Sequence, residues 1–153
     1  MARVKYMKSR KTLKYFFAAY VLLMVWLLFF RYRGVLVTDY WAQAADRVNL
    51  VPFASIGSML RTLREYPRLD VLWVVVYNLG GNIVMFIPLG FFLPALWEKF
   101  RSLLRCLGAV AVIMAGVEFL QLLTLRGFCE IDDVMLNLTG AAIGYGVYKI
   151  WKR

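Results

Sequence analysis

The sequence predicts an all-α integral membrane protein with four transmembrane helices. Hydrophobic residues make up 62% of the 153-residue chain, and the mean hydropathy is +0.65. Soluble domains are typically about 45–50% apolar. Four apolar stretches have about the 20-residue length that a bilayer core demands, and charged segments separate them. The length suits one domain, so we expect residues 1–153 to form a single membrane domain.

The first predicted span runs from Leu13 to Phe30 and follows a basic arm. A basic start before an apolar run is also typical of a signal peptide, and Ala42-Gln43-Ala44 offers a cleavage-like site. Arg31 and Arg33 end the apolar run well before that triplet. We therefore favour a retained anchor, so that residues 1–33 form the basic arm and the first membrane anchor.

Residues 31–70 are too long for a plain hairpin between two spans. Apolar residues recur there at helix-like spacing, at Phe53, Ile56, Met59, Leu60 and Leu63. This pattern predicts a helix lying in the outer membrane interface. A flexible extracytoplasmic linker is the alternative.

The second predicted span, Val71 to Trp97, carries no charge. Pro88 and Pro94 interrupt it, and a proline inside a helix removes a hydrogen bond and clashes with the preceding turn. We therefore expect a kinked or broken segment. The third predicted span is Leu103 to Leu125, and the fourth is Val134 to Ile150.

Basic residues mark one side of the predicted membrane. They dominate the N-terminal arm, the 98–105 loop and the C-terminal end, whereas the 126–133 loop holds one arginine and three acids. Because Lys and Arg favour the cytoplasmic side, both termini are expected inside and the acidic loop outside. The net charge of +10 flanks apolar runs, so we expect membrane lipids and no nucleic acid as partners.

Histidine is absent, which removes the commonest general base and transition-metal ligand. Cys106 and Cys129 bracket the third span, about 35 Å apart on an ideal helix, so no disulfide is expected within one copy. Neither cysteine has a metal-type spacing.

Each of the last three spans offers two polar residues three or four positions apart, which places them on one helix face. The predicted outer ends carry all three pairs, and we expect them to converge. They are Asn78 with Asn82, Glu118 with Gln121, and Asp133 with Asn137.

Glu118 is the most informative of these residues, because a charge in a spanning helix costs several kcal/mol unless it faces protein or water. Hydrogen bonding to Asn78 or Asn82 for packing alone is the alternative. Asp132 and Asp133 diverge on a helix, so one can face a cavity while the other caps the fourth helix. A Mg²⁺ or Ca²⁺ ion bridging Glu118 and Asp132 matches no known metal motif, and we expect no cofactor.

Gly140 and Gly144 form a GxxxG pattern on the fourth span. This pattern usually marks a close-packing face between helices. A homo-oligomer formed through these glycines is one prediction that follows.

Three sequence blocks resemble the VanZ-like family. The first is Asn49-Leu50-Val51-Pro52-Phe53, the second begins at Asn78-Leu-Gly-Gly-Asn82, and the third runs from Glu118 through Arg126 to Asp132-Asp133 and Gly140. The blocks cover residues 49–145 in the family's order. The resemblance implies a multi-pass protein of the bacterial cell membrane, in a family whose founding members lower susceptibility to the glycopeptide antibiotic teicoplanin.

Three functions follow as hypotheses. The first is a factor acting at the outer leaflet on cell-surface or lipid-linked wall material, reducing glycopeptide binding. The second is a membrane-embedded hydrolase or transferase on a polyprenyl-linked substrate, and the third is a structural or partner subunit. In the first two, Glu118, Arg126 and Asp132 would act on the ligand, with Arg126 engaging an anionic group. The ligand-binding residues would be Asn78, Asn82, Gln121, Asp133 and Asn137.

Overall fold

The computed structural model describes the backbone of residues 2–30 and 39–153, and the side chains of residues 10–30 and 39–153. Arg31 and Arg33, expected to end the first anchor, lie outside the described residues, as do the side chains of the first nine residues. The elements are α1 (Ala2–Phe29), α2 (Tyr40–Ala45), β1 (Val48–Asn49), α3 (Ala54–Glu65), α4 (Leu69–Leu96), the short 3₁₀ helix η1 (Glu98–Phe100), α5 (Leu103–Thr124), β2 (Cys129–Glu130) and α6 (Ile131–Trp151).

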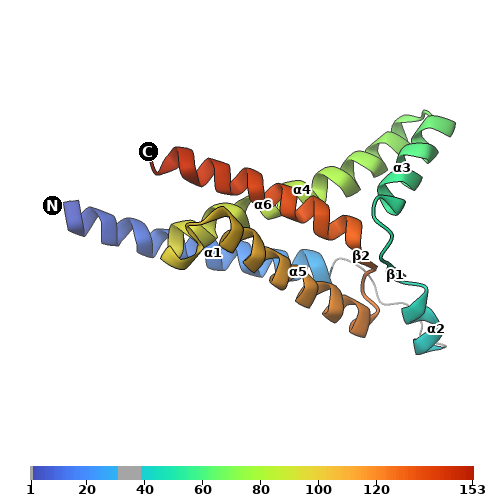
Figure 1. The fold of residues 1–153 in the computed structure, drawn as a ribbon, viewed down its shortest axis with the longest axis horizontal. Coiled ribbons are helices and arrows are strands. Elements are labelled where there is room, and N and C mark those ends of the chain that lie inside the picture. Colours follow the sequence, from blue (N-terminus) through green and yellow to red (C-terminus); the bar gives the residue numbers. More distant parts are fainter. Residues whose placement is uncertain (1, 31–38) are drawn as a thin grey trace.

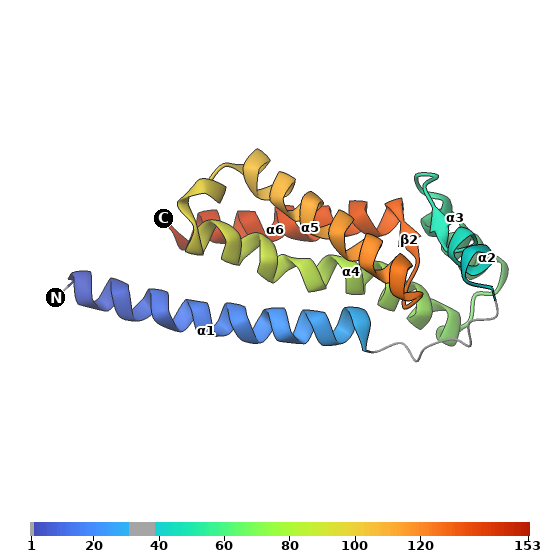
Figure 2. The same ribbon diagram turned by 90° about the horizontal axis from the view of Figure 1, so that it is seen from below.

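Four long helices, α1, α4, α5 and α6, lie side by side as a bundle (Figures 1 and 2). Both termini are at one end of this bundle, while α2, α3 and the short strands gather at the other. Within the described residues, three helical segments are long and apolar enough to cross a membrane: Arg10–Phe29, Leu69–Leu96 and Leu103–Thr124. The expectation of a helical membrane protein is therefore confirmed. The expected fourth span lies within α6.

α4 is one continuous helix of 28 residues, although it contains Pro88 and Pro94. The prediction of a kinked or broken segment is therefore wrong as to a break, and the kink stays a prediction. Pro94 has no N–H to donate to the carbonyl of Gly90, one turn earlier. The thiol of Cys106 on α5 lies 3.8 Å from that carbonyl oxygen and contacts it in place of the missing donor. A neighbouring helix can re-satisfy backbone freed by proline, which is why the helix continues.

The closest helix contact in the bundle joins α4 to α6 at three glycines: Gly90 on α4, against the carbonyl of Ala141, and Gly140 and Gly144 on α6. A Cβ atom added to Gly140 would lie 2.0 Å from the carbonyl oxygen of Ile83, and one added to Gly144 would lie 1.9 Å from that of Ile87. The GxxxG pattern therefore serves a contact within the chain. In this chain α4 occupies the face that carries Gly140 and Gly144, and the homo-oligomer stays a prediction.

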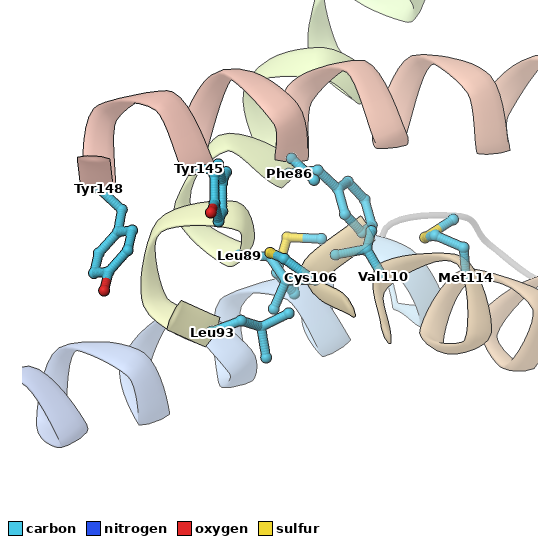
Figure 3. Packing of buried hydrophobic residues seen from close by; sticks show 10 residues of the cluster. Phe86, Leu89, Leu93, Cys106, Val110, Met114, Tyr145 and Tyr148 are labelled. Carbon is cyan, nitrogen blue, oxygen red and sulfur yellow. The ribbon is translucent and has the colours of Figure 1, made fainter. Parts of the chain in front are cut away.

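The buried core lies between α4, α5 and α6, with Met24 reaching it from α1. Figure 3 shows how the apolar side chains of the three helices meet. They come from Phe86, Leu89 and Leu93 on α4, Cys106, Val110 and Met114 on α5, and Tyr145 and Tyr148 on α6. On α1, the Tyr20 hydroxyl donates to the carbonyl of Met85 at 2.8 Å. This core fixes the helix positions on which the polar residues depend.

From residue 39 onward, the segment expected as an interfacial helix or a linker contains α2, β1 and α3. α3 includes four of the five apolar residues that predicted a helix, and the fifth, Phe53, precedes it in a left-handed conformation with φ 63°. β1 pairs in parallel with β2, with Val48 opposite Cys129. This pairing ties the segment to the loop between α5 and α6.

Asn49 shapes the turn between β1 and α3. Its side-chain oxygen accepts from the N–H of Val51 at 3.2 Å, and its amide donates to the Ser55 hydroxyl at 3.1 Å. Asn side chains commonly organise turns in this way. The first family-like block is thus a turn that leads the chain into α3.

Candidate functional site

The polar residues of the bundle line one cavity of about 670 Å³. Its walls come from the last turns of α1 and α5, the first halves of α4 and α6, α3, and the loop before β2. All eight residues singled out in the sequence line it: Asn78, Asn82, Glu118, Gln121, Arg126, Asp132, Asp133 and Asn137. The three polar pairs therefore meet at the end of the bundle opposite the termini.

Glu118, on α5, is only 4% exposed. Its Oε2 atom has no hydrogen-bond partner among the described residues, and no ion pair there joins it to an arginine. The carboxylates of Asp133 and Glu130 are close enough to repel it electrostatically. A buried acceptor without a donor is costly, so Glu118 is the residue whose surroundings are least explained by packing.

The two asparagines of α4 are engaged elsewhere. The Asn78 amide donates to the carbonyl of Val74 in its own helix at 2.7 Å. The Asn82 amide donates to Asp133 Oδ1 at 2.5 Å and so joins α4 to α6. The alternative in which either asparagine satisfies Glu118 is therefore not the arrangement in this structure.

Asn137, one turn after Asp133 on α6, is 2% exposed. Its amide nitrogen lies 3.5 Å from the sulfur of Met114, while its Oδ1 has no partner among the described residues. Met114 and Glu118 are four residues apart and share a face of α5. Asn137 and Glu118 therefore both line the cavity, and each has one buried acceptor without a partner among the described residues.

Asp132 is 2% exposed and accepts two backbone hydrogen bonds from the start of α3. Its Oδ1 accepts from the N–H of Phe53 at 2.5 Å, and its Oδ2 accepts from the N–H of Ile56 at 3.0 Å. The first N–H groups of a helix have no partner in the helix itself, and a carboxylate there is favoured by the helix dipole. Asp132 therefore caps α3, whereas the sequence predicted that it could cap its own helix, α6.

Gln121 and Arg126 hold the end of α1. The Gln121 amide donates to the carbonyl of Leu28 at 3.0 Å, and Arg126 Nη1 donates to that of Phe29 at 2.8 Å. The Arg126 guanidinium also lies over the ring of Phe30, 5.6 Å from its centroid. Both side chains line the cavity while satisfying carbonyls that a helix end leaves open.

Arg47 and Glu130 also line the cavity, and neither residue was predicted from the sequence to belong to the site. Arg47 Nη1 donates to the carbonyls of Leu125 at 2.8 Å and Gly127 at 3.3 Å, and its guanidinium stacks over Phe128. Arg47 precedes a family-like block by two positions, which is the only signal that pointed to it. Contacts of a side chain with loop carbonyls produce no periodic pattern in the sequence, so they could not be predicted from it.

The charged residues that line the cavity are four acids and two arginines. Among the described residues, no three His, Cys, Asp or Glu side chains lie close enough together to hold a metal ion. Both oxygens of Asp132 already accept N–H groups. These contacts do not favour a cation bridging Glu118 and Asp132. The cavity instead offers buried acceptors that can bind a donor group or exchange a proton with one.

Comparison with known proteins gives a family match over most of the chain. The family model described as VanZ/LLP1 matches residues 17–152. Protein VanZ of Enterococcus faecium is 24% identical over 133 residues, which cover 86% of this chain and 70% of that protein. No solved structure matches.

Proposed function

Because the chain belongs to the VanZ/LLP1 family, we propose that it is a bacterial cell-membrane protein that lowers susceptibility to glycopeptide antibiotics such as teicoplanin. It acts at the outer leaflet by binding, or acting on, cell-surface or lipid-linked wall material. Such binding would reduce the amount of wall target that the antibiotic reaches.

The observation that carries this proposal is the unpartnered Oε2 atom of Glu118, a residue that lines a cavity large enough for a head group. Cavities that hold small ligands usually measure about 300–1,000 Å³ and place a few polar groups among apolar walls. Packing alone gives no reason to leave a buried acceptor unpaired. A ligand that donates to Glu118 would supply the missing partner.

The proposed orientation puts the cavity on the outer side and both termini in the cytoplasm, with α6 as the fourth span. The surplus of Lys and Arg in the N-terminal arm, in the 98–105 loop and at the C-terminus supports it. The shared position of the two termini at one end of the bundle is compatible with an even number of spans (Figure 2).

The side chains divide into two proposed roles. Glu118 and Asn137 contact the ligand directly, and the Asn82–Asp133 pair orients it from the facing wall. Asp132, by contrast, positions α3. Gln121 and Arg126 position α1 in the same way, because each already contacts the backbone of another element.

Substitution of three cavity residues tests the proposal in a susceptible Gram-positive host. Glu118→Gln, Arg126→Ala and Asp132→Asn are compared with Glu65→Gln, an exposed position on α3 outside the cavity lining. Membrane abundance and the inhibitory concentration of teicoplanin are measured for each. Glu118→Gln is expected at normal abundance with resistance lost, whereas Asp132→Asn lowers abundance because α3 loses its cap.

Resistance that survives Glu118→Gln at normal abundance would remove Glu118 from the function. Loss of abundance in Glu118→Gln would instead favour the third hypothesis, a structural subunit. Glu65→Gln should match the wild type in both measurements.

Catalysis is the second candidate, since a buried carboxyl group can accept and return a proton during hydrolysis or transfer on a polyprenyl-linked substrate. Purified protein is incubated with lipid-linked wall precursors, and products are sought by mass spectrometry. A product formed by the wild type and lost in Glu118→Gln favours an enzyme. Unchanged precursors favour binding alone.

A further inference from the structure

The chemical character of the cavity follows from the atoms that remain without partners. Glu118 Oε2 and Asn137 Oδ1 are both hydrogen-bond acceptors, both buried, and both without a donor among the described residues. They come from α6 and α5, and the Asn137 amide nitrogen contacts the sulfur of Met114, one turn before Glu118 on α5. A ligand that completes this site must therefore donate hydrogen bonds to two acceptors at once.

The charges around these acceptors favour a positive ligand. The acids lining the cavity, Glu118, Glu130, Asp132 and Asp133, outnumber its arginines, Arg47 and Arg126. Both arginines are directed to backbone carbonyls and stacked on phenylalanine rings. An anionic ligand would meet the repulsion that Asp133 and Glu130 already exert on Glu118. The cavity therefore favours a cationic ligand over the anionic group that Arg126 was expected to engage.

A metal ion fits the cavity less well than an organic cation. Among the described residues, no three acidic or thiol side chains converge closely enough for a metal. The space of about 670 Å³ is also that of a molecular group. A primary ammonium is compact, carries one positive charge and has three N–H donors. Its three donors match in number the two unpartnered acceptors, Glu118 Oε2 and Asn137 Oδ1, and one further carboxylate of the lining such as that of Asp133.

We infer that this cavity binds a primary ammonium group, presented by a lipid head group or by a peptide of the cell wall. The inference rests on the proposed function only in using the same cavity, and it can be tested without the antibiotic.

The lipid source is tested with full-length wild-type protein purified in detergent. Binding of phosphatidylethanolamine, phosphatidylcholine and phosphatidylglycerol with identical acyl chains is measured by native mass spectrometry. Phosphatidylcholine carries the positive charge without N–H donors, and phosphatidylglycerol carries no ammonium. We expect phosphatidylethanolamine to bind about 10- to 100-fold more tightly than either, because charge-assisted hydrogen bonds are worth roughly 1.5–3 kcal/mol.

The peptide source is tested by calorimetry with a lysine-containing wall pentapeptide whose α-amino group is blocked, and with the Nε-acetylated form of the same blocked peptide. Acetylation removes the charge and two of the donors while keeping the rest of the peptide. If the ammonium comes from the wall, the free peptide binds at least about tenfold more tightly than the acetylated one.

Glu118→Gln removes the charged acceptor and keeps the side-chain shape. It should abolish the preference for the amine, whereas Glu65→Gln, the matched loss of one charge at an exposed position, should keep it. Asn137→Leu removes the second acceptor and should weaken amine binding several-fold, which provides a variant if Glu118→Gln does not fold. The wild-type comparison needs neither variant.

A preference for the amine in either source, lost in Glu118→Gln, supports the inference. It is overturned if neither amine is preferred, if phosphatidylglycerol binds most tightly, or if the preference survives in Glu118→Gln. Amine binding lost in Glu118→Gln without any change in teicoplanin susceptibility would keep the inference and refute the proposed function. If the wild type shows no preference for amines but Glu118→Gln abolishes resistance, the inference is refuted and the proposed function is kept.

Discussion

Replacing Gly144 by alanine should separate the two most closely packed helices of the bundle. The new Cβ would lie 1.9 Å from the oxygen of Ile87, 2.8 Å from its carbonyl carbon and 3.0 Å from the nitrogen of Phe91, whereas ordinary contact begins at 3.4 Å. All three neighbours are backbone atoms, so no side-chain rotation can relieve the clash. α4 and α6 must therefore part by roughly 1.5 Å.

The loss in the free energy of unfolding follows from the packing contacts that Gly144→Ala removes. Overpacking a well-filled core by one methyl group costs about 1–3 kcal/mol when side chains can adjust. Here the backbones must move, and a gap of even 0.5–1 Å forfeits about a quarter to a half of each dispersion contact along the interface. We therefore expect Gly144→Ala to lower the free energy of unfolding by at least about 3 kcal/mol.

Gly146→Ala is the matched control, because it lies on the same helix and its added Cβ meets nothing within 4 Å. Alanine favours a helix over glycine by about 1 kcal/mol, so this variant should be unchanged or slightly more stable. Both purified proteins are unfolded by titration with SDS in mixed micelles, and the loss of tertiary structure is followed by near-UV circular dichroism. Equal unfolding midpoints for the two variants would refute the close contact between α4 and α6.

Three further outcomes are expected. Asp132→Asn replaces the charged acceptor of two N–H groups at the start of α3, at a cost of about 1–3 kcal/mol. Trypsin should therefore cleave the variant at Arg61 and Arg64 faster than it cleaves the wild type, and unchanged cleavage rates would contradict the cap. Gln121→Leu removes a donor to a carbonyl at the end of α1 and should lower stability in the same SDS titration by about 1 kcal/mol, and a gain in stability would argue against this contact. Burial, and then the nearby charge of Glu118, raise the pKa of the Cys129 thiol, so its thiolate fraction at pH 8 is below that of an ordinary thiol. The rate at which an impermeant maleimide labels Cys129 on intact cells should therefore keep rising to a higher pH than the rate for glutathione does. A rate that follows glutathione at every pH would contradict the burial, and labelling confined to inverted vesicles would contradict the proposed orientation.

Hydropathy and helix periodicity predicted the long apolar helices of the bundle. The expected spans from Leu13, Val71 and Leu103 correspond within a few residues to the apolar segments Arg10–Phe29, Leu69–Leu96 and Leu103–Thr124, and the family assignment is confirmed. The common face of Glu118 and Gln121 was likewise visible from their spacing, since it depends only on helix geometry. The break expected as one alternative in α4 is absent, because Cys106 lies against the carbonyl that Pro94 leaves free, and the sequence does not reveal this contact.

The partners of the cavity residues could not be predicted in this way. Asp132 binds the backbone near Phe53, 79 residues away, and the contact depends on a left-handed turn that no side-chain pattern requires. Arg47 is placed by a strand pair of two residues on each side, which is too short to produce alternation in the sequence. Backbone groups are the same at every position, so a contact made to them leaves no trace in residue type.

The attachment of α1 determines when the molecule can be completed during synthesis. α1 leaves the ribosome first, yet the donors for its last carbonyls, on Gln121 and Arg126, are made more than ninety residues later. Until α5 enters the membrane, the carbonyls of Leu28 and Phe29 must be hydrated in the head-group layer. The cavity wall that these residues share therefore closes only after α5 and the loop that follows it have been made, and the end of α1 stays hydrated until then.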